Sequence, residues 1–290
     1  MKLVHNIIVA LKGFFMGAAN VVPGVSGGTI ALITGIYKEI IDALDSLMEK
    51  ATWQALLKGN LKDFWNQIHG TFLLWLGIGV ALSVFSLAKL MTYVLANFPV
   101  QTWAFFFGLI IASAVLMFKD IKGWGIKEIL FTILGVALGL TVCTLSPTET
   151  PDNWFFIFLC GAIAVCTMIL PGISGSFILV ILGKYDFIMQ AIADLNWPVL
   201  AVFALGCVVG LLAFAKFLHW LLGRSEKQTM LVLLGFVLGS LVKVWPWAND
   251  SVKALPEPHY GAAALWCLLG IALVLGVEAL ATRSAKRQSD

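Results

Sequence analysis

Two apolar segments of the chain are interrupted near their middle by proline, glycine and serine. The first carries PGVSGG at residues 23–28, and the second carries PGISGS at residues 171–176. Proline removes a backbone donor, and glycine releases the chain from helical geometry. Inside a bilayer, such backbone is tolerated only where protein or a water-filled cavity satisfies its polar groups. Both interruptions are therefore expected to face protein or a cavity, not lipid.

The composition indicates a membrane protein that crosses the bilayer several times. Of the 290 residues, 60% are hydrophobic and only 12% are charged, about half the charged fraction of a soluble domain. Several apolar runs reach the roughly 20 residues that a membrane-spanning helix needs. The net charge of +3 gives no indication of a nucleic-acid partner. The five cysteines and four histidines form no metal-ligand spacing, and no nucleotide-binding motif is present, so we expect no metal and no cofactor.

The chain contains an internal duplication. An offset of 148 residues pairs Pro23 with Pro171 and Tyr37 with Tyr185, together with the surrounding glycines and serines. An offset of 127 pairs Gly79 with Gly206, Lys89 with Lys216, and several residues beyond them. The matching blocks come in the same order in both halves. We therefore predict one membrane domain, residues 1–290, built from repeat one at 1–148 and repeat two at 149–290.

Each repeat has a proline- and glycine-tipped apolar pair followed by three apolar spans. The arms of the first pair, Ile7–Val22 and Thr29–Leu44, are short for full crossings and are typical of a hairpin that enters and leaves on one side. The predicted spans are 71–95, 101–118 and 128–146, then 197–221, 229–246 and 260–281. An odd number of crossings per repeat inverts the second repeat. The predicted fold is an all-α polytopic membrane protein of two inverted repeats, each a re-entrant helical hairpin plus three transmembrane helices.

The distribution of basic residues indicates the orientation. With the N-terminus in the cytoplasm, fourteen Lys and Arg residues fall in cytoplasmic segments and three, Lys184, Lys243 and Lys253, fall outside. This asymmetry predicts that both termini are cytoplasmic and that the two hairpins enter from opposite faces.

The hairpin tips have the chemistry of an anion site. Helix starts after such tips present unpaired N–H groups, glycines let a ligand approach the backbone, and hydroxyls add donors. Two opposed tips would form a midplane site, with phosphate as the natural ligand. The expected substrate-binding residues are Gly24, Ser26, Gly27, Gly28, Thr29, Gly172, Ser174, Gly175 and Ser176. The alternative is that these small residues merely allow close helix packing.

Other polar residues have two interpretations each. Lys89 and Lys216 are repeat-matched within spans, which favours a head-group or gating role, yet both lie where snorkelling to the interface is easy. Tyr37 and Tyr185 could also contact a head group, or they could anchor the protein at the interface. Glu39 could carry a coupling proton, although solvation at a cytoplasmic end would suffice to explain it.

Three segments resemble the bacterial polyprenyl-phosphate transporter family: GFFMGAANVVPGVSGGTIALITGIYKEII, FFFGLIIAS and LPGISGSF. The resemblance covers nearly the whole chain. It implies a non-enzymatic flippase in the bacterial cytoplasmic membrane that returns undecaprenyl phosphate, the lipid carrier of cell-wall precursors, to the cytoplasmic leaflet. It also implies phosphate binding at the two tips. Many members have Asp where this chain has Asn20, a possible coupling position, which puts proton coupling in doubt here.

Two other functions compete with this one. Undecaprenyl pyrophosphate phosphatases have a similar motif, PGxSRSxxT, but Gly175 stands here where that motif has Arg. Without that charge, hydrolysis of a pyrophosphate lacks its electrostatic stabilisation. The second alternative is a carrier or channel for a small anion, since the tips would serve it equally well.

Overall fold

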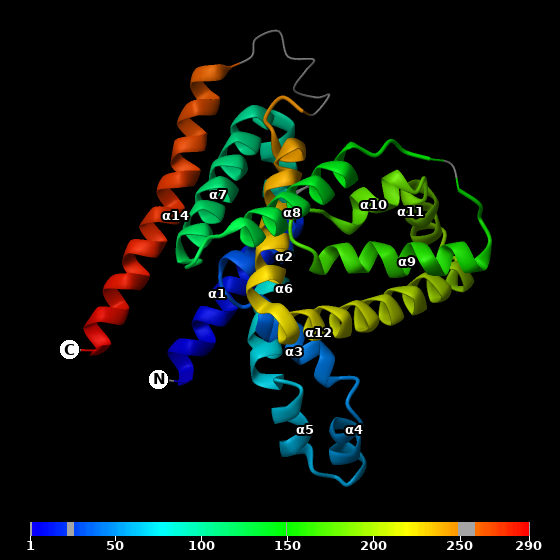
Figure 1. The fold of residues 1–290 in the computed structure, drawn as a ribbon. Helices are drawn as coiled ribbons and strands as arrows, with labels where there is room; N and C mark the ends of the chain where they lie inside the picture. Colours follow the sequence, from blue (N-terminus) through cyan, green and yellow to red (C-terminus); the bar gives the residue numbers. More distant parts are fainter. Residues whose placement is uncertain (1, 22–25, 149, 249–258, 290) are drawn as a thin grey trace.

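The computed structural model describes residues 2–21, 26–148, 150–248 and 259–289, and within these ranges the side chains of residues 2, 21, 88, 89, 91, 92, 120 and 277–289 lie outside the description. All regular secondary structure in these ranges is helical (Figure 1). The elements in repeat one are α1 Lys2–Val21, α2 Gly27–Ile33, α3 Tyr37–Ser46, α4 Lys50–Leu57, α5 Leu61–Gln67, α6 Gly70–Asn97, α7 Pro99–Asp120 and α8 Ile126–Thr144. Those in repeat two are α9 Trp154–Ile169, α10 Gly175–Ile181, α11 Tyr185–Ala193, α12 Trp197–Val244 and α14 Tyr260–Ser289.

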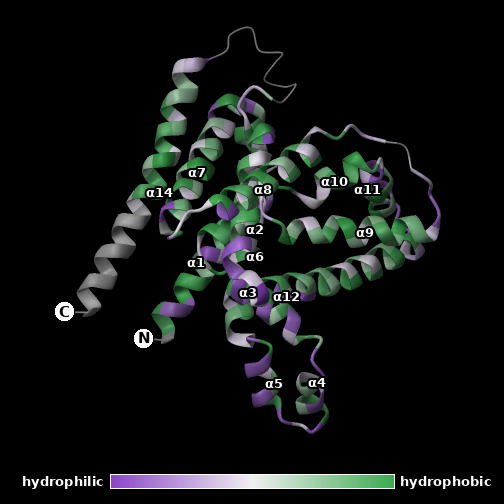
Figure 2. Ribbon diagram, in the orientation of Figure 1, coloured by the Kyte–Doolittle hydropathy of each residue, from purple (hydrophilic) through white to green (hydrophobic). Residues whose placement is uncertain are grey.

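The long apolar helices fit a polytopic membrane protein. Among the described residues, five helices are long and apolar enough to cross a membrane: α1, α6, α7, α8 and α12. Figure 2 shows hydrophobic residues along α7, α8, α9 and α12, whereas hydrophilic residues gather on α3 and α5. Large apolar side chains such as Leu130 and Ile133 on α8 point outward, as expected for a surface that faces lipid.

Helix α12 joins two of the predicted spans. The sequence predicted spans at 197–221 and 229–246 with a connection between them, but this connection is helical. A straight helix of 48 residues would be about 72 Å long, more than twice the thickness of the hydrocarbon core. The backbone leaves helical geometry at Ser225, with φ −156° and ψ 66°. The break divides α12 into two arms of roughly the predicted lengths.

Glycines bring helices into close contact at matching positions in the two repeats. A Cβ at Gly79 of α6 would overlap the carbonyl oxygen of Ala10 on α1. At the matching position in repeat two, a Cβ at Gly206 of α12 would overlap the carbonyl oxygen of Phe158 on α9. These glycines differ by the sequence offset of 127, and their contact partners differ by 148. The pairs α1–α6 and α9–α12 thus pack in the same register.

The third span of each repeat packs against the second span of the other repeat. Helix α14 lies beside α7, where Gly108 closely approaches the carbonyl group of Cys267. Helix α8 lies beside the second arm of α12, where Gly235 closely approaches the carbonyl group of Thr132. Thr132 and Cys267 also occupy matching positions. The last helix of each predicted repeat therefore packs against the other predicted repeat.

The second arm of each predicted hairpin is bent into two helices. Gly35, with φ +73°, separates α2 from α3, and Gly183, with φ +62°, separates α10 from α11. The bend between α10 and α11 is 112°. These values of φ favour glycine because it lacks a Cβ. Consequently α2 and α10 are each only seven residues long, about 10 Å, and each carries a PG-x-SG tip at its start.

Candidate functional site

The described residues of the first tip form hydrogen bonds with the first turn of α2. Gly24 lies outside the described residues, and Ser26 is the first described residue of this tip. Ser26 caps α2, because its hydroxyl accepts a hydrogen bond from the Gly28 amide at 3.1 Å. The Asn20 side chain of α1 accepts another from the Gly27 amide at 2.8 Å. The first amides of α2 therefore already have partners within the protein.

The two tips are in direct contact. The Ser26 hydroxyl donates to the carbonyl oxygen of Leu170 at 3.1 Å, and the Thr29 hydroxyl accepts from the Gly172 amide at 2.7 Å. Ser26 and Thr29 are each only 1% exposed. Gly28 permits this approach, because a Cβ there would overlap the carbonyl oxygen of Ile169. The described residues of the first tip, from Ser26 to Thr29, are therefore buried and contact the second tip.

The second tip opens onto a cavity of about 270 Å³. Ser174 caps α10 by accepting from the Phe177 amide at 3.3 Å, and its hydroxyl lies 3.2 Å from that of Ser176. Ser176 is exposed, in contrast to the buried serine of the first tip. The cavity is lined by Trp103, Cys143, Gly172, Ile173, Ser174, Ser176, Phe177, Val180, Tyr185 and Lys243. Gly175 is buried and packs against the carbonyl oxygen of Ala164.

Lys243 supplies a positive charge to this cavity. It lies in the last turn of α12, and its ammonium group is 4.2 Å from the centre of the Phe177 ring, within range of a cation–π interaction. No described carboxylate forms an ion pair with it. The sequence prediction missed Lys243 because it was counted only as a base in an external segment. Its position at the end of an apolar span was the signal that could have found it.

The other predicted residues lie in different places. Tyr185 lines the cavity at the second tip, whereas Tyr37 is 2% exposed and its hydroxyl has no hydrogen-bond partner among the described residues. Glu39 lies 3.8 Å from His69 in another cavity, away from both tips. Lys216 lines a separate cavity at the break in α12, and the Lys89 side chain lies outside the description. Among the members of this group whose side chains the structure describes, Tyr185 lines the cavity at the second tip.

Comparisons with known proteins agree on one family. The profile of the VCA0040-like family, described as undecaprenyl phosphate translocase-like, matches residues 16–258. A protein of Vibrio cholerae named polyprenyl-phosphate transporter is 37% identical over 97% of this chain and 99% of its own length. A Staphylococcus aureus protein with the same name is 33% identical over 83% of this chain and 87% of its own length. No solved structure matches the chain significantly.

Proposed function

Because the chain belongs to the VCA0040-like family of undecaprenyl phosphate translocase-like proteins, we propose that it is a membrane transporter of polyprenyl phosphate. Two relatives that carry the name polyprenyl-phosphate transporter align with most of its length. The protein acts as a flippase and not as an enzyme. Its substrate is undecaprenyl phosphate in the bacterial cytoplasmic membrane, returned from the outer to the cytoplasmic leaflet.

The observation that carries this proposal is the cavity at the second tip. Ser174, Ser176 and Lys243 all line it. A phosphate group placed there would receive hydrogen bonds from both serines and charge compensation from the lysine, the strongest kind of contact available to it. The cavity is about 270 Å³ and mostly lined by apolar atoms, so it suits a phosphate that arrives on a hydrocarbon chain. Moving that phosphate through lipid unaided would cost many kcal/mol.

Two inverted repeats would allow the binding site to open alternately toward the two leaflets. The matching glycine contacts of α1–α6 and α9–α12, together with the exchanged third spans, support a duplicated unit. The excess of Lys and Arg in the predicted cytoplasmic segments supports opposite orientations for the two units, with both termini in the cytoplasm. In this conformation the second tip would receive the head group, while residues 26–29 of the first tip are buried. Separation of the tips and rocking of one repeat against the other would then open the first tip to the opposite side.

Liposomes that contain polyprenyl phosphate test this function through the fraction of phosphate groups accessible from outside. Purified wild-type protein should change this fraction quickly. Lys243→Gln should slow the change by about 10- to 150-fold, because a charge-assisted contact worth about 1.5–3 kcal/mol is lost. Lys122→Gln is the matched control, since Lys122 is exposed and does not line the cavity.

Two results would contradict the proposal. Equal rates for the wild type and Lys243→Gln would show that the cavity is not part of the transport path. If the liposomes leak inorganic phosphate while the lipid stays in place, the protein is a carrier of small anions and not of the lipid.

A further inference from the structure

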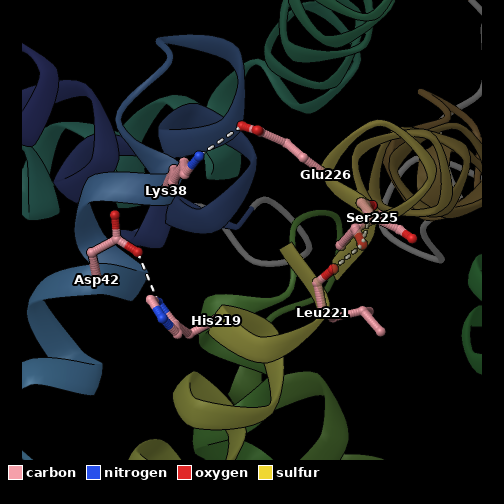
Figure 3. A network of polar contacts seen from close by, with 7 residues as sticks. Lys38, Asp42, His219, Leu221, Ser225 and Glu226 are labelled. Carbon is pink, nitrogen blue, oxygen red and sulfur yellow. Dashed lines mark hydrogen bonds and ion pairs between the residues drawn. The ribbon is translucent and has the colours of Figure 1, made fainter. Parts of the chain in front are cut away.

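A second basic cavity lies at the break in α12, away from the two tips. Its volume is about 530 Å³, and its lining residues are Asp45, Lys216, His219, Trp220, Gly223 and Arg224. All but Asp45 lie on the stretch of α12 that directly precedes Ser225. Figure 3 shows the same region, where α3 meets α12 through Asp42 and His219 on one side of the break and through Lys38 and Glu226 on the other.

The charges around this cavity leave two cations available. The nearby acids contact other side chains: Asp42 lies 2.9 Å and Asp45 3.8 Å from the ring nitrogens of the one histidine His219, and Lys38 lies 3.1 Å from Glu226. Asp45 also lines the cavity. Neither Lys216 nor Arg224 forms an ion pair with a described residue. The cavity therefore offers an ammonium group and a guanidinium group to an anion, and guanidinium suits phosphate geometry well.

The Arg224 guanidinium lies over an aromatic neighbour. It lies 5.7 Å from the centre of the Trp220 ring, within range of a cation–π interaction. This contact leaves the planar N–H donors of the guanidinium free to bind a phosphate oxygen. Trp220 and Arg224 thus place an apolar ring beside a cation in the lining of the cavity.

An exposed apolar stripe on α12 leads directly to this cavity. Leu205, Val209, Phe217 and Trp220 recur at helical spacing, and each is between 46% and 57% exposed. Side chains three and four residues apart share one face of a helix, and the exposed Ala213 lies between Val209 and Phe217. Together these side chains form a strip about 22 Å long. A strip of this kind that ends at two cations matches an amphiphile with a hydrocarbon chain and an anionic head group.

The spacing between the two basic cavities matches a membrane. The second arm of α12 runs from Ser225 to Lys243, which corresponds to about 27 Å of helix. The hydrocarbon core of a bilayer is about 30 Å thick. One arm of α12 therefore separates the two cavities by about the distance between the two head-group layers.

From these observations we propose that the cavity at Lys216 and Arg224 is a second binding site for the transported lipid phosphate. The phosphate group lies between the two cations, and the polyprenyl chain lies along the strip from Leu205 to Trp220. The site serves the cytoplasmic leaflet, and the cavity at Lys243 serves the outer leaflet. This inference rests on the proposed function and adds a site from which the lipid is released into the cytoplasmic leaflet.

Native mass spectrometry of the purified full-length protein with added polyprenyl phosphate tests the inference by counting bound lipids. The wild type should bind two, and the Lys216→Gln/Arg224→Gln double variant should bind one, with at least tenfold weaker affinity for the other. Lys243→Gln should also bind one, and a triple variant should bind none. Lys122→Gln is the control and should bind two, and thermal unfolding should show that all variants are folded.

The outcomes separate failure of this inference from failure of the function. No lipid bound by the wild type would contradict the proposed function itself. One lipid, lost only with Lys243→Gln, would leave the function standing and overturn the second site. Displacement of the lipid at Lys216 and Arg224 by equimolar phosphatidylglycerol would also overturn it, because the cavity would then take any anionic phospholipid.

Discussion

The hydrogen bond between the two tips can be removed with almost no change in shape. The Gly172 amide donates to the Thr29 hydroxyl at 2.7 Å, and Thr29 is 1% exposed. Thr29→Val replaces that hydroxyl with a methyl group of similar size. The buried amide of Gly172 then loses its acceptor while the tips remain together.

The cost of this change follows from the burial. A buried donor left without a partner costs about 1–3 kcal/mol, which corresponds to a factor of about 5 to 150 in an equilibrium constant. The penalty applies only while the tips touch, because after separation the amide can bind water. Thr29→Val should therefore raise the population with separated tips by that factor, and Thr29→Ser should leave it close to the wild-type value.

Hydrogen exchange measured by mass spectrometry follows this population directly, because the Gly172 amide itself exchanges when the tips separate. A peptide that contains Gly172 should exchange about 5- to 150-fold faster in Thr29→Val than in the wild type. Peptides from α5 should exchange equally in both proteins, since α5 packs against α4 and α6. Unchanged exchange at Gly172 in Thr29→Val, or equal acceleration in Thr29→Ser, would refute the tip contact as described.

Two further predictions concern helix packing and the loop between α8 and α9. Gly79→Ala should destabilise the protein by about 1–3 kcal/mol, because its Cβ would overlap the backbone of Ala10. Gly77→Ala, where no atom lies within 4 Å, should cost almost nothing in the same unfolding titration. Asp152→Asn should lower the unfolding temperature, because Lys184, only 4% exposed, loses its carboxylate partner at 2.5 Å. Restoring the charge with Asp152→Glu should recover part of this loss, and equal unfolding temperatures for all three proteins would contradict the prediction.

The membrane-spanning helices could be predicted because the length of an apolar run is a local property. The predicted spans 71–95, 101–118 and 128–146 correspond closely to α6, α7 and α8. The break in α12 could not be placed in the same way. Polar residues between two apolar runs suggest a loop, yet residues 222–228 continue as helix and only Ser225 departs from it. Contacts with α3 on both sides of that residue are visible only in the tertiary structure.

The candidate site was partly predictable from the repeat. The duplication indicated which residues form the tips, because PGVSGG and PGISGS align directly. It did not indicate how the tips meet, since Ser26 contacts Leu170 and not its repeat partner Ser174. Lys243 was also missed for a physical reason, because repeat one has Leu116 at the matching position. A search for symmetry cannot find a charge that only one repeat carries.

The exchange of last helices between the repeats also affects how the protein is made. The Gly108 face of α7 packs on α14, which begins only at Tyr260. During synthesis, α7 therefore enters the membrane more than 100 residues before its partner is translated. A nascent chain that stops after repeat one would hold both α7 and α8 without their binding partners. Each half completes the other, so the two halves are expected to mature together at the end of translation.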